Sequence, residues 1–187
     1  MGTLKKQGNT PIIQCSAPLS TIGSWTILHL PKAASVKLPS RGMTMGEGTI
    51  NGSHFQIPLE PDGKGSHWFS FDKAMSKATG AKAGDTIKVE MTPMEEWPEP
   101  EIPADIKKAL ASAPHSYETW LETTPMARWD WIRWIRSTNN PDTRKKRIVV
   151  GCDKLRKGMK RPCCFNRSMC TVPEVSKGGV LLEPVVP

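Results

Sequence analysis

The chain's most reactive side chains gather towards its carboxyl end, where Cys163 and Cys164 stand between Arg161 and Arg167 and Cys170 follows Arg167 by three residues. Neighbouring guanidinium groups lower the pKa of a thiol, so these three candidate thiols could act as nucleophiles. Structural zinc sites usually use cysteine pairs separated by two to four residues, and an adjacent pair followed by a gap of five does not fit. Free cysteines are often buried as small apolar side chains. We therefore favour buried cysteines over a reactive thiol, and a reactive thiol over a metal site.

A second set of candidates is cationic. Thirteen basic residues stand against three acidic ones between Arg128 and Arg167, in a chain whose net charge is +8. Such a surface attracts phosphates or acidic proteins. The candidate ligand- or phosphate-binding residues are Arg133, Arg136, Arg144 and Arg147. A solvated basic helix face is the simpler interpretation of the same charges, and we favour it.

Tryptophans stand among these arginines. Aromatic and basic side chains together can hold single-stranded nucleic acid, by base stacking and by phosphate contacts. However, Trp120, Trp131 and Trp134 follow the spacing of one helical stripe, which is typical of a bundle core. Only Trp129 falls outside that stripe. The pattern therefore favours core side chains over a stacking platform.

The sequence contains no nucleophile elbow, no phosphate-binding loop and no zinc-protease motif. Its four histidines lack the spacing of metal ligands, and its acidic residues form no evident acid–base couple. We therefore predict no catalytic residue, no metal and no cofactor. An enzyme is the less favoured class and stays open.

The hydrophobic pattern changes at a cluster of prolines. Before it, apolar and polar residues alternate, as in Trp25–Leu30 and Thr86–Met91, which indicates half-buried strands. Four prolines between Pro93 and Pro103 indicate a stiff connector, and helical spacing follows. The predicted units are a β domain over residues 11–98, a basic helical bundle over 99–160 and an extended, cysteine-containing tail over 161–187.

The β domain contains one insertion with clear boundaries. Asn51-Gly52 predicts a tight hairpin turn, because both residue types tolerate positive φ. Asp72 is a candidate N-cap for a short helix over Lys73–Thr79, and Gly80 is its expected stop. The predicted fold class is therefore α+β: a small split β-barrel with one inserted helix, followed by a small helical bundle.

Several motifs, taken in order, carry a resemblance. They are Gly48-Thr49-Ile50-Asn51-Gly52, Gly84-Asp85 before the closing strand, Pro103-Ala104-Asp105, and Thr143-Arg144 with Arg147-Ile148. Together they resemble the bacteriocin-protection family, the YdeI/OmpD-associated proteins, whose N-terminal barrel is a domain of unknown function. The strand–helix–turn–strand order also resembles AbrB-like DNA-binding barrels. The resemblance implies a fold, a bacterial source and a protective role, but no active site.

Compartment and function follow as expectations. Five cysteines with one adjacent pair do not suit a disulfide framework, so reduced thiols and a cytoplasmic location are expected. No apolar run is long enough for a membrane span. We expect a cytoplasmic binding or stress-protection protein without assigned catalysis, whose partner is an unknown acidic protein or an anionic ligand. The alternatives are a nucleic-acid-binding protein that uses the basic bundle, and a thiol-dependent activity at the C-terminal cysteines.

Overall fold

A computed structural model describes residues 10–162 and 172–187 of the chain. It divides the chain into two compact units, one of residues 1–95 with 183–187 and one of residues 96–182. The three candidate thiols, Cys163, Cys164 and Cys170, lie outside the described residues, so their role stays a prediction.

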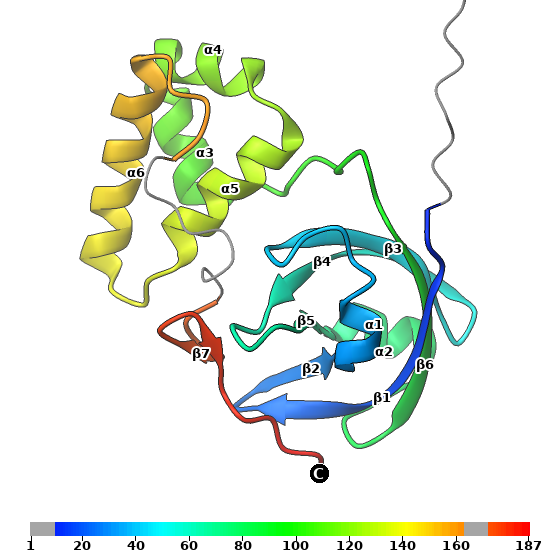
Figure 1. The fold of residues 1–187 in the computed structure, drawn as a ribbon. Helices are drawn as coiled ribbons and strands as arrows, with labels where there is room; N and C mark the ends of the chain where they lie inside the picture. The colour runs from blue at the N-terminus through cyan, green and yellow to red at the C-terminus, as the bar shows by residue number, and fades with distance from the viewer. Residues whose placement is uncertain (1–9, 163–171) are drawn as a thin grey trace, which may run out of the picture. The chain divides into compact units, whose positions relative to one another are not determined.

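The first unit is a barrel of six antiparallel strands (Figure 1). The strands are β1 Ile13–Ile22, β2 Trp25–His29, β3 Thr44–Ile50, β4 Ser53–Pro61, β5 His67–Ser70 and β6 Thr86–Pro93. Their order is β1-β2-β5-β4-β3-β6, and β6 pairs with β1 to close the circle. The predicted barrel is therefore confirmed.

Two helical segments interrupt the strands. α1, Lys32–Ser35, is a single turn between β2 and β3. α2, Lys73–Thr79, is the predicted insertion: the Asp72 carboxylate accepts a hydrogen bond from the Met75 amide at 2.8 Å, and Gly80 ends the helix at a φ of 74°. The N-cap and the stop that the sequence indicated are both confirmed.

The barrel core follows from the alternation of its strands. Inward positions such as Ile13, Leu28, Leu59, Phe69 and Val89 are at most 2% exposed. Burying one such side chain stabilises the folded state by roughly 1.5–3 kcal/mol. The same alternation points Gln14, Lys88 and Glu90 outward, and all three are exposed.

The second unit is helical, as predicted. Its helices are α3 Ala104–Ala111, α4 Pro114–Glu122, α5 Pro125–Arg136 and α6 Pro141–Arg156, and a short hairpin follows, with β7 Ser176–Lys177 and β8 Val180–Leu181. Within the described part of the chain, no helix has both the length and the apolar character needed to cross a membrane.

α5 and α6 begin in the same way, with a side-chain N-cap followed by a proline. Thr124 accepts a hydrogen bond from the Ala127 amide, and Asn140 accepts from the Asp142 and Thr143 amides; a proline follows each cap at the first helical position. Between these helices lies the core, in which Trp120 and Trp131 are 2% and 1% exposed. The predicted tryptophan stripe is therefore core.

The last residues of the chain pair with the barrel. Val185 and Thr21 exchange backbone hydrogen bonds at 2.7 and 2.9 Å, and the Lys64 ammonium lies 2.6 Å from the Glu183 carboxylate. Residues 183–187 therefore belong to the first unit, although the helical unit separates them from it in sequence.

Candidate functional site

The outer face of α6 is cationic and open to a partner. Lys145 and Lys146 are exposed there, and neither forms an ion pair with any residue that the structure describes. Val149 and Val150 follow one turn later and are 69% and 42% exposed. Since residues three and four apart share a helix face, lysines and valines form one stripe, which we call the α6 surface.

Two lysines of α3 extend the positive charge. Lys107 and Lys108 are exposed and likewise have no ion pair among the described residues. They lie within a turn of Asp105, whose carboxylate receives two hydrogen bonds from the Arg144 guanidinium, at 2.7 and 2.9 Å. This forked pair joins α3 to α6 and places the α3 lysines close to the start of the α6 surface.

The first of the four predicted arginines, Arg144, is held in this forked pair with Asp105. Hydrogen bonds from Arg144 hold the pKa of Asp105 below its usual value, against a smaller opposing effect of burial. The same bonds raise the pKa of Arg144. The Arg144 charge is therefore already matched by a carboxylate of its own unit.

Arg147 is also used within the unit. Its guanidinium donates to the Trp134 carbonyl at 2.7 Å and to the Ser137 hydroxyl at 2.9 Å, and it lies 5.7 Å from the centre of the Trp134 ring. It thereby satisfies carbonyl groups that the end of α5 leaves without helical partners. Lys154 approaches the same ring, at 5.5 Å.

Arg133 and Arg136 lie one turn apart on α5. Arg133 is 1% exposed and does not face solvent in this structure, whereas Arg136 is partly exposed. The structure therefore brings the four predicted arginines together as two pairs on adjacent helices, but not as one open cluster. Their binding to a ligand stays a prediction. Lys145 and Lys146, which do face solvent, come from the same basic block as Arg144 and Arg147. Helical periodicity is the sequence signal that distinguishes these two lysines from the two arginines.

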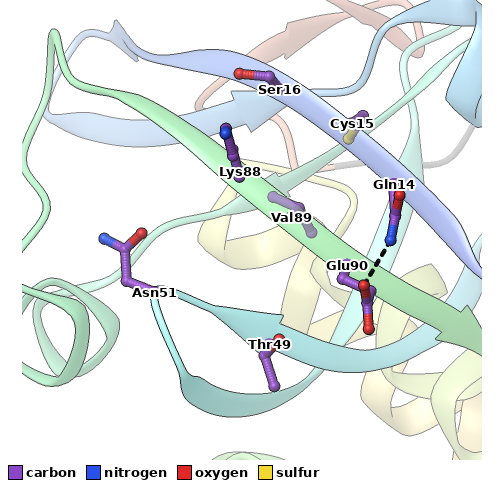
Figure 2. A pocket seen from close by; sticks show the side chains of 8 residues that line it. All are labelled: Gln14, Cys15, Ser16, Thr49, Asn51, Lys88, Val89 and Glu90. Atoms are coloured by element: carbon purple, nitrogen blue, oxygen red, sulfur yellow. Dashed lines mark hydrogen bonds between the residues drawn. The ribbon is translucent and has the colours of Figure 1, made fainter.

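A different kind of site lies on the barrel. A concavity of about 560 Å³ opens on the outer face of β1, β6 and β3 (Figure 2). Its rim carries an ammonium, a carboxylate, two hydroxyl groups and two amides. Its lining residues are Gln14, Cys15, Ser16, Thr49, Asn51, Lys88, Val89 and Glu90.

Comparison with known proteins gives a family match for each unit. Residues 99–158 match the model of the OmdA family, described as bacteriocin-protection, YdeI or OmpD-associated. Residues 9–91 match DUF1905, a domain of unknown function. The helical unit therefore matches the bacteriocin-protection family, and the barrel matches a domain of unknown function. No curated protein matches it.

The motifs that carry the resemblance to this family have structural roles. Gly48 pairs with Met91 where β3 meets β6, and a Cβ there would lie 2.7 Å from the Met91 Cα and overlap the Glu90 carbonyl oxygen. Asn51 and Gly52 have φ values of 48° and 80°, as a tight hairpin turn requires. These motifs and the Asp105–Arg144 pair therefore stabilise the fold, and the residues that could bind a partner are sought elsewhere.

One buried constellation in the barrel could be mistaken for a nucleophile and its base. The Ser35 hydroxyl lies 2.8 Å from His67 Nδ1, and His67 Nε2 lies 2.9 Å from the Gly42 carbonyl. A carbonyl only accepts, so Nε2 donates to it and Nδ1 accepts from Ser35. Both residues are 0% exposed, and burial lowers the pKa of His67. Without access for a substrate, the pair stabilises the fold.

The described cysteines and the possible metal ligands also give no candidate site. Cys15 and Cys152 are half-buried, and burial raises the pKa of both thiols, which disfavours the reactive thiolate. Among the described residues, no three His, Cys, Asp or Glu side chains lie close enough to hold a metal ion. Two surfaces that the described residues offer for function are the α6 surface and the barrel concavity.

Proposed function

We propose that this chain is a cytoplasmic binding protein of the bacteriocin-protection type, and that its helical unit holds an acidic protein partner on the α6 surface. The match of residues 99–158 to that family supports the protective role. The α6 surface supports the mode of action and the class of partner, as the following steps argue.

The observation that carries the proposal is the combination of unpaired lysines with exposed valines. Lys145 and Lys146 have no ion pair among the described residues, and Val149 exposes 69% of its surface. Isolated surface valines are common, but here two adjacent ones follow the lysines on one face. Covering them removes apolar area from water, which favours association with another protein.

Charge selects the partner. The four exposed lysines of α3 and α6 attract an acidic surface and speed its diffusional encounter. Dissolved ions screen such exposed charges over about 10 Å at 0.1 M salt, so the attraction should weaken as salt rises. The valine contribution should not weaken in the same way, because apolar burial does not depend on screening.

Nucleic-acid binding is the alternative, and the structure provides a distinction between the two. Phosphate contacts need cations but no apolar surface, so they would leave Val149 and Val150 without a role. If Arg144 or Arg147 contacted phosphate, it would first have to leave Asp105 or the end of α5. A thiol-dependent activity at Cys163, Cys164 or Cys170 is a third possibility, which alkylation of the native protein would test.

The test uses three probes: a peptide with Glu and Leu at amphipathic helical spacing, a poly-Glu peptide of equal length, and double-stranded DNA. We expect the amphipathic peptide to bind most tightly. Lys145→Gln with Lys146→Gln should weaken binding and flatten its salt dependence, whereas Val149→Ser with Val150→Ser should weaken binding but keep the salt dependence. The control, Lys73→Gln with Lys77→Gln on the exposed face of α2, should bind normally.

Two results would overturn the proposal. If no peptide binds at low salt, the α6 surface is not a protein-binding site. If DNA binds most tightly, with a salt slope that Arg144→Ala and Arg147→Ala each reduce, the nucleic-acid alternative is correct. Fractionation of the source cells tests the cytoplasmic location, because recovery from a membrane or secreted fraction contradicts it.

A further inference from the structure

The concavity on the barrel has the features of a second, separate binding site. It lies on three neighbouring strands of one sheet, and strands hold side chains more precisely than loops do. Its volume of about 560 Å³ falls within the range of small-molecule sites, roughly 300–1,000 Å³. Alternation directs Cys15 and Val89 to the core side, so the outward residues of the lining are polar.

Strand register arranges those polar residues in two rows. One row runs Gln14–Glu90–Thr49, because Glu90 pairs with Gln14 of β1 and with Thr49 of β3. In the second row Lys88 pairs with Ser16. Asn51, in the turn that follows β3, also lines the concavity, and its amide donates a hydrogen bond of 3.4 Å to the Thr79 carbonyl. Figure 2 shows Lys88 and Glu90 on β6, with the β1 and β3 residues on either side.

The two rows carry opposite charges. The first centres on the Glu90 carboxylate, which the Gln14 amide holds through a hydrogen bond of 2.7 Å. The second centres on the Lys88 ammonium, which has no ion pair among the described residues. The Ser16 and Thr49 hydroxyl groups also make no hydrogen bond to a described residue. Each row therefore offers one charge together with polar groups that are available to a ligand.

The separation of the rows limits the ligand. Lys88 and Glu90 are two residues apart on one strand, so their Cα atoms are about 6.6 Å apart. A simple anion that reached Lys88 would lie close to the Glu90 carboxylate, and a simple cation on Glu90 would lie close to Lys88. A molecule that carries both charges a few ångströms apart satisfies both rows at once.

We propose that this concavity binds a small zwitterion, namely a free amino acid or a short peptide with charged ends. Its carboxylate lies against Lys88 and Ser16, with the Asn51 amide beside them. Its ammonium group lies against Glu90 and Thr49. Because the site is open to water and the charges are exposed, binding is weak and its affinity falls as salt rises.

The test is a titration of the full-length, ¹⁵N-labelled protein, followed by the amide chemical shifts. Glycylglycine is the zwitterionic probe, and acetate and methylammonium are its two halves. We expect millimolar glycylglycine to shift the amides of Ser16, Lys88 and Glu90, and each half alone to shift them several-fold less. Lys88→Met and Glu90→Gln should each reduce the glycylglycine response several-fold.

A matched control and the contrary results complete the design. Lys37→Met removes an exposed lysine from the loop after α1, outside the lining, and should leave the response unchanged. The proposal is wrong if glycylglycine shifts none of these amides, or if acetate alone reproduces its shifts. It is also wrong if both charge variants respond as the native protein does. Since α6 takes no part, Lys145→Gln with Lys146→Gln should not affect this titration.

Discussion

Replacing Gly48 with alanine should open the barrel at the seam between β3 and β6. A Cβ at this position would lie 2.7 Å from the Met91 Cα and overlap the Glu90 carbonyl oxygen. Carbon atoms in contact are normally about 3.5–4.0 Å apart. These neighbours are backbone atoms, which cannot rotate away as a side-chain tip can. The two strands must therefore separate by about 1 Å.

The cost follows from the ladder that this separation disturbs. β3 and β6 pair at five positions, from Gly46 with Pro93 to Ile50 with Val89. Overpacking typically costs about 1–3 kcal/mol, and each lost hydrogen bond about 1 kcal/mol net. We therefore expect Gly48→Ala to lower the free energy of unfolding by about 3–5 kcal/mol, a large share of the roughly 5–15 kcal/mol of a typical domain.

Thermal unfolding followed by circular dichroism would measure this effect. At about 4–8 °C per kcal/mol for a domain of this size, the barrel transition should fall by more than ~12 °C. Gly46→Ala is the matched control: its Cβ would meet side-chain atoms rather than backbone, with Leu59 Cδ1 at 3.0 Å, Leu59 Cγ at 3.5 Å and Met91 Sδ at 3.6 Å. If Gly48→Ala unfolds at the same temperature as Gly46→Ala, the backbones of β3 and β6 are not as close at Gly48 as we describe.

Two further substitutions test the helical unit and the buried histidine. Gly151→Ala in α6 should raise the free energy of unfolding by about 0.5–1 kcal/mol, since alanine is the better helix former; its Cβ would lie 3.8 Å from the Trp131 and Trp134 rings, at ordinary contact distance. Urea denaturation measures this, and a loss of stability would show that α5 and α6 cannot accept a methyl group. His67 should make the barrel less stable as pH falls below about 6.5, by up to about 1.4 kcal/mol per pH unit, because burial lowers its pKa and the unfolded chain binds the proton first. His67→Gln should reduce that slope in denaturation curves between pH 7 and 5, and an unchanged slope would assign the proton to another group.

Local signals in the sequence were sufficient for most element boundaries. Asp72 and Gly80 delimit α2, and Thr124 and Asn140 begin α5 and α6, because each of these residues satisfies backbone groups within a few positions of itself. Closure of the barrel is different. It depends on the pairing of Gly48 with Met91, over forty positions away, and no local pattern encodes such a pairing.

The basic block of α6 shows the limit of reasoning from charge. Arg144, Lys145, Lys146 and Arg147 are indistinguishable in a count of positive residues. A helix turns by about 100° per residue, so the two arginines face the unit and the two lysines face solvent. The partners that decide this, Asp105 and the end of α5, are remote in sequence. Side-chain chemistry agrees with the division, since a planar guanidinium can form several directed hydrogen bonds at once.

The same division between structural and exposed residues bears on where function resides in this protein. Gly48, Asn51-Gly52 and the Asp105–Arg144 pair are explained by backbone approach, turn geometry and helix attachment. Residues that hold a fold together in this way are poor candidates for recognising a partner, because changing them alters the scaffold itself. Recognition is better placed on residues that the fold does not need. Lys145, Val149 and Lys88 meet that condition, because their side chains are exposed and none of these side chains has an ion pair or hydrogen bond to a described residue. Substituting them should therefore change binding while the unfolding temperature stays constant, and that separation is what the experiments above can detect.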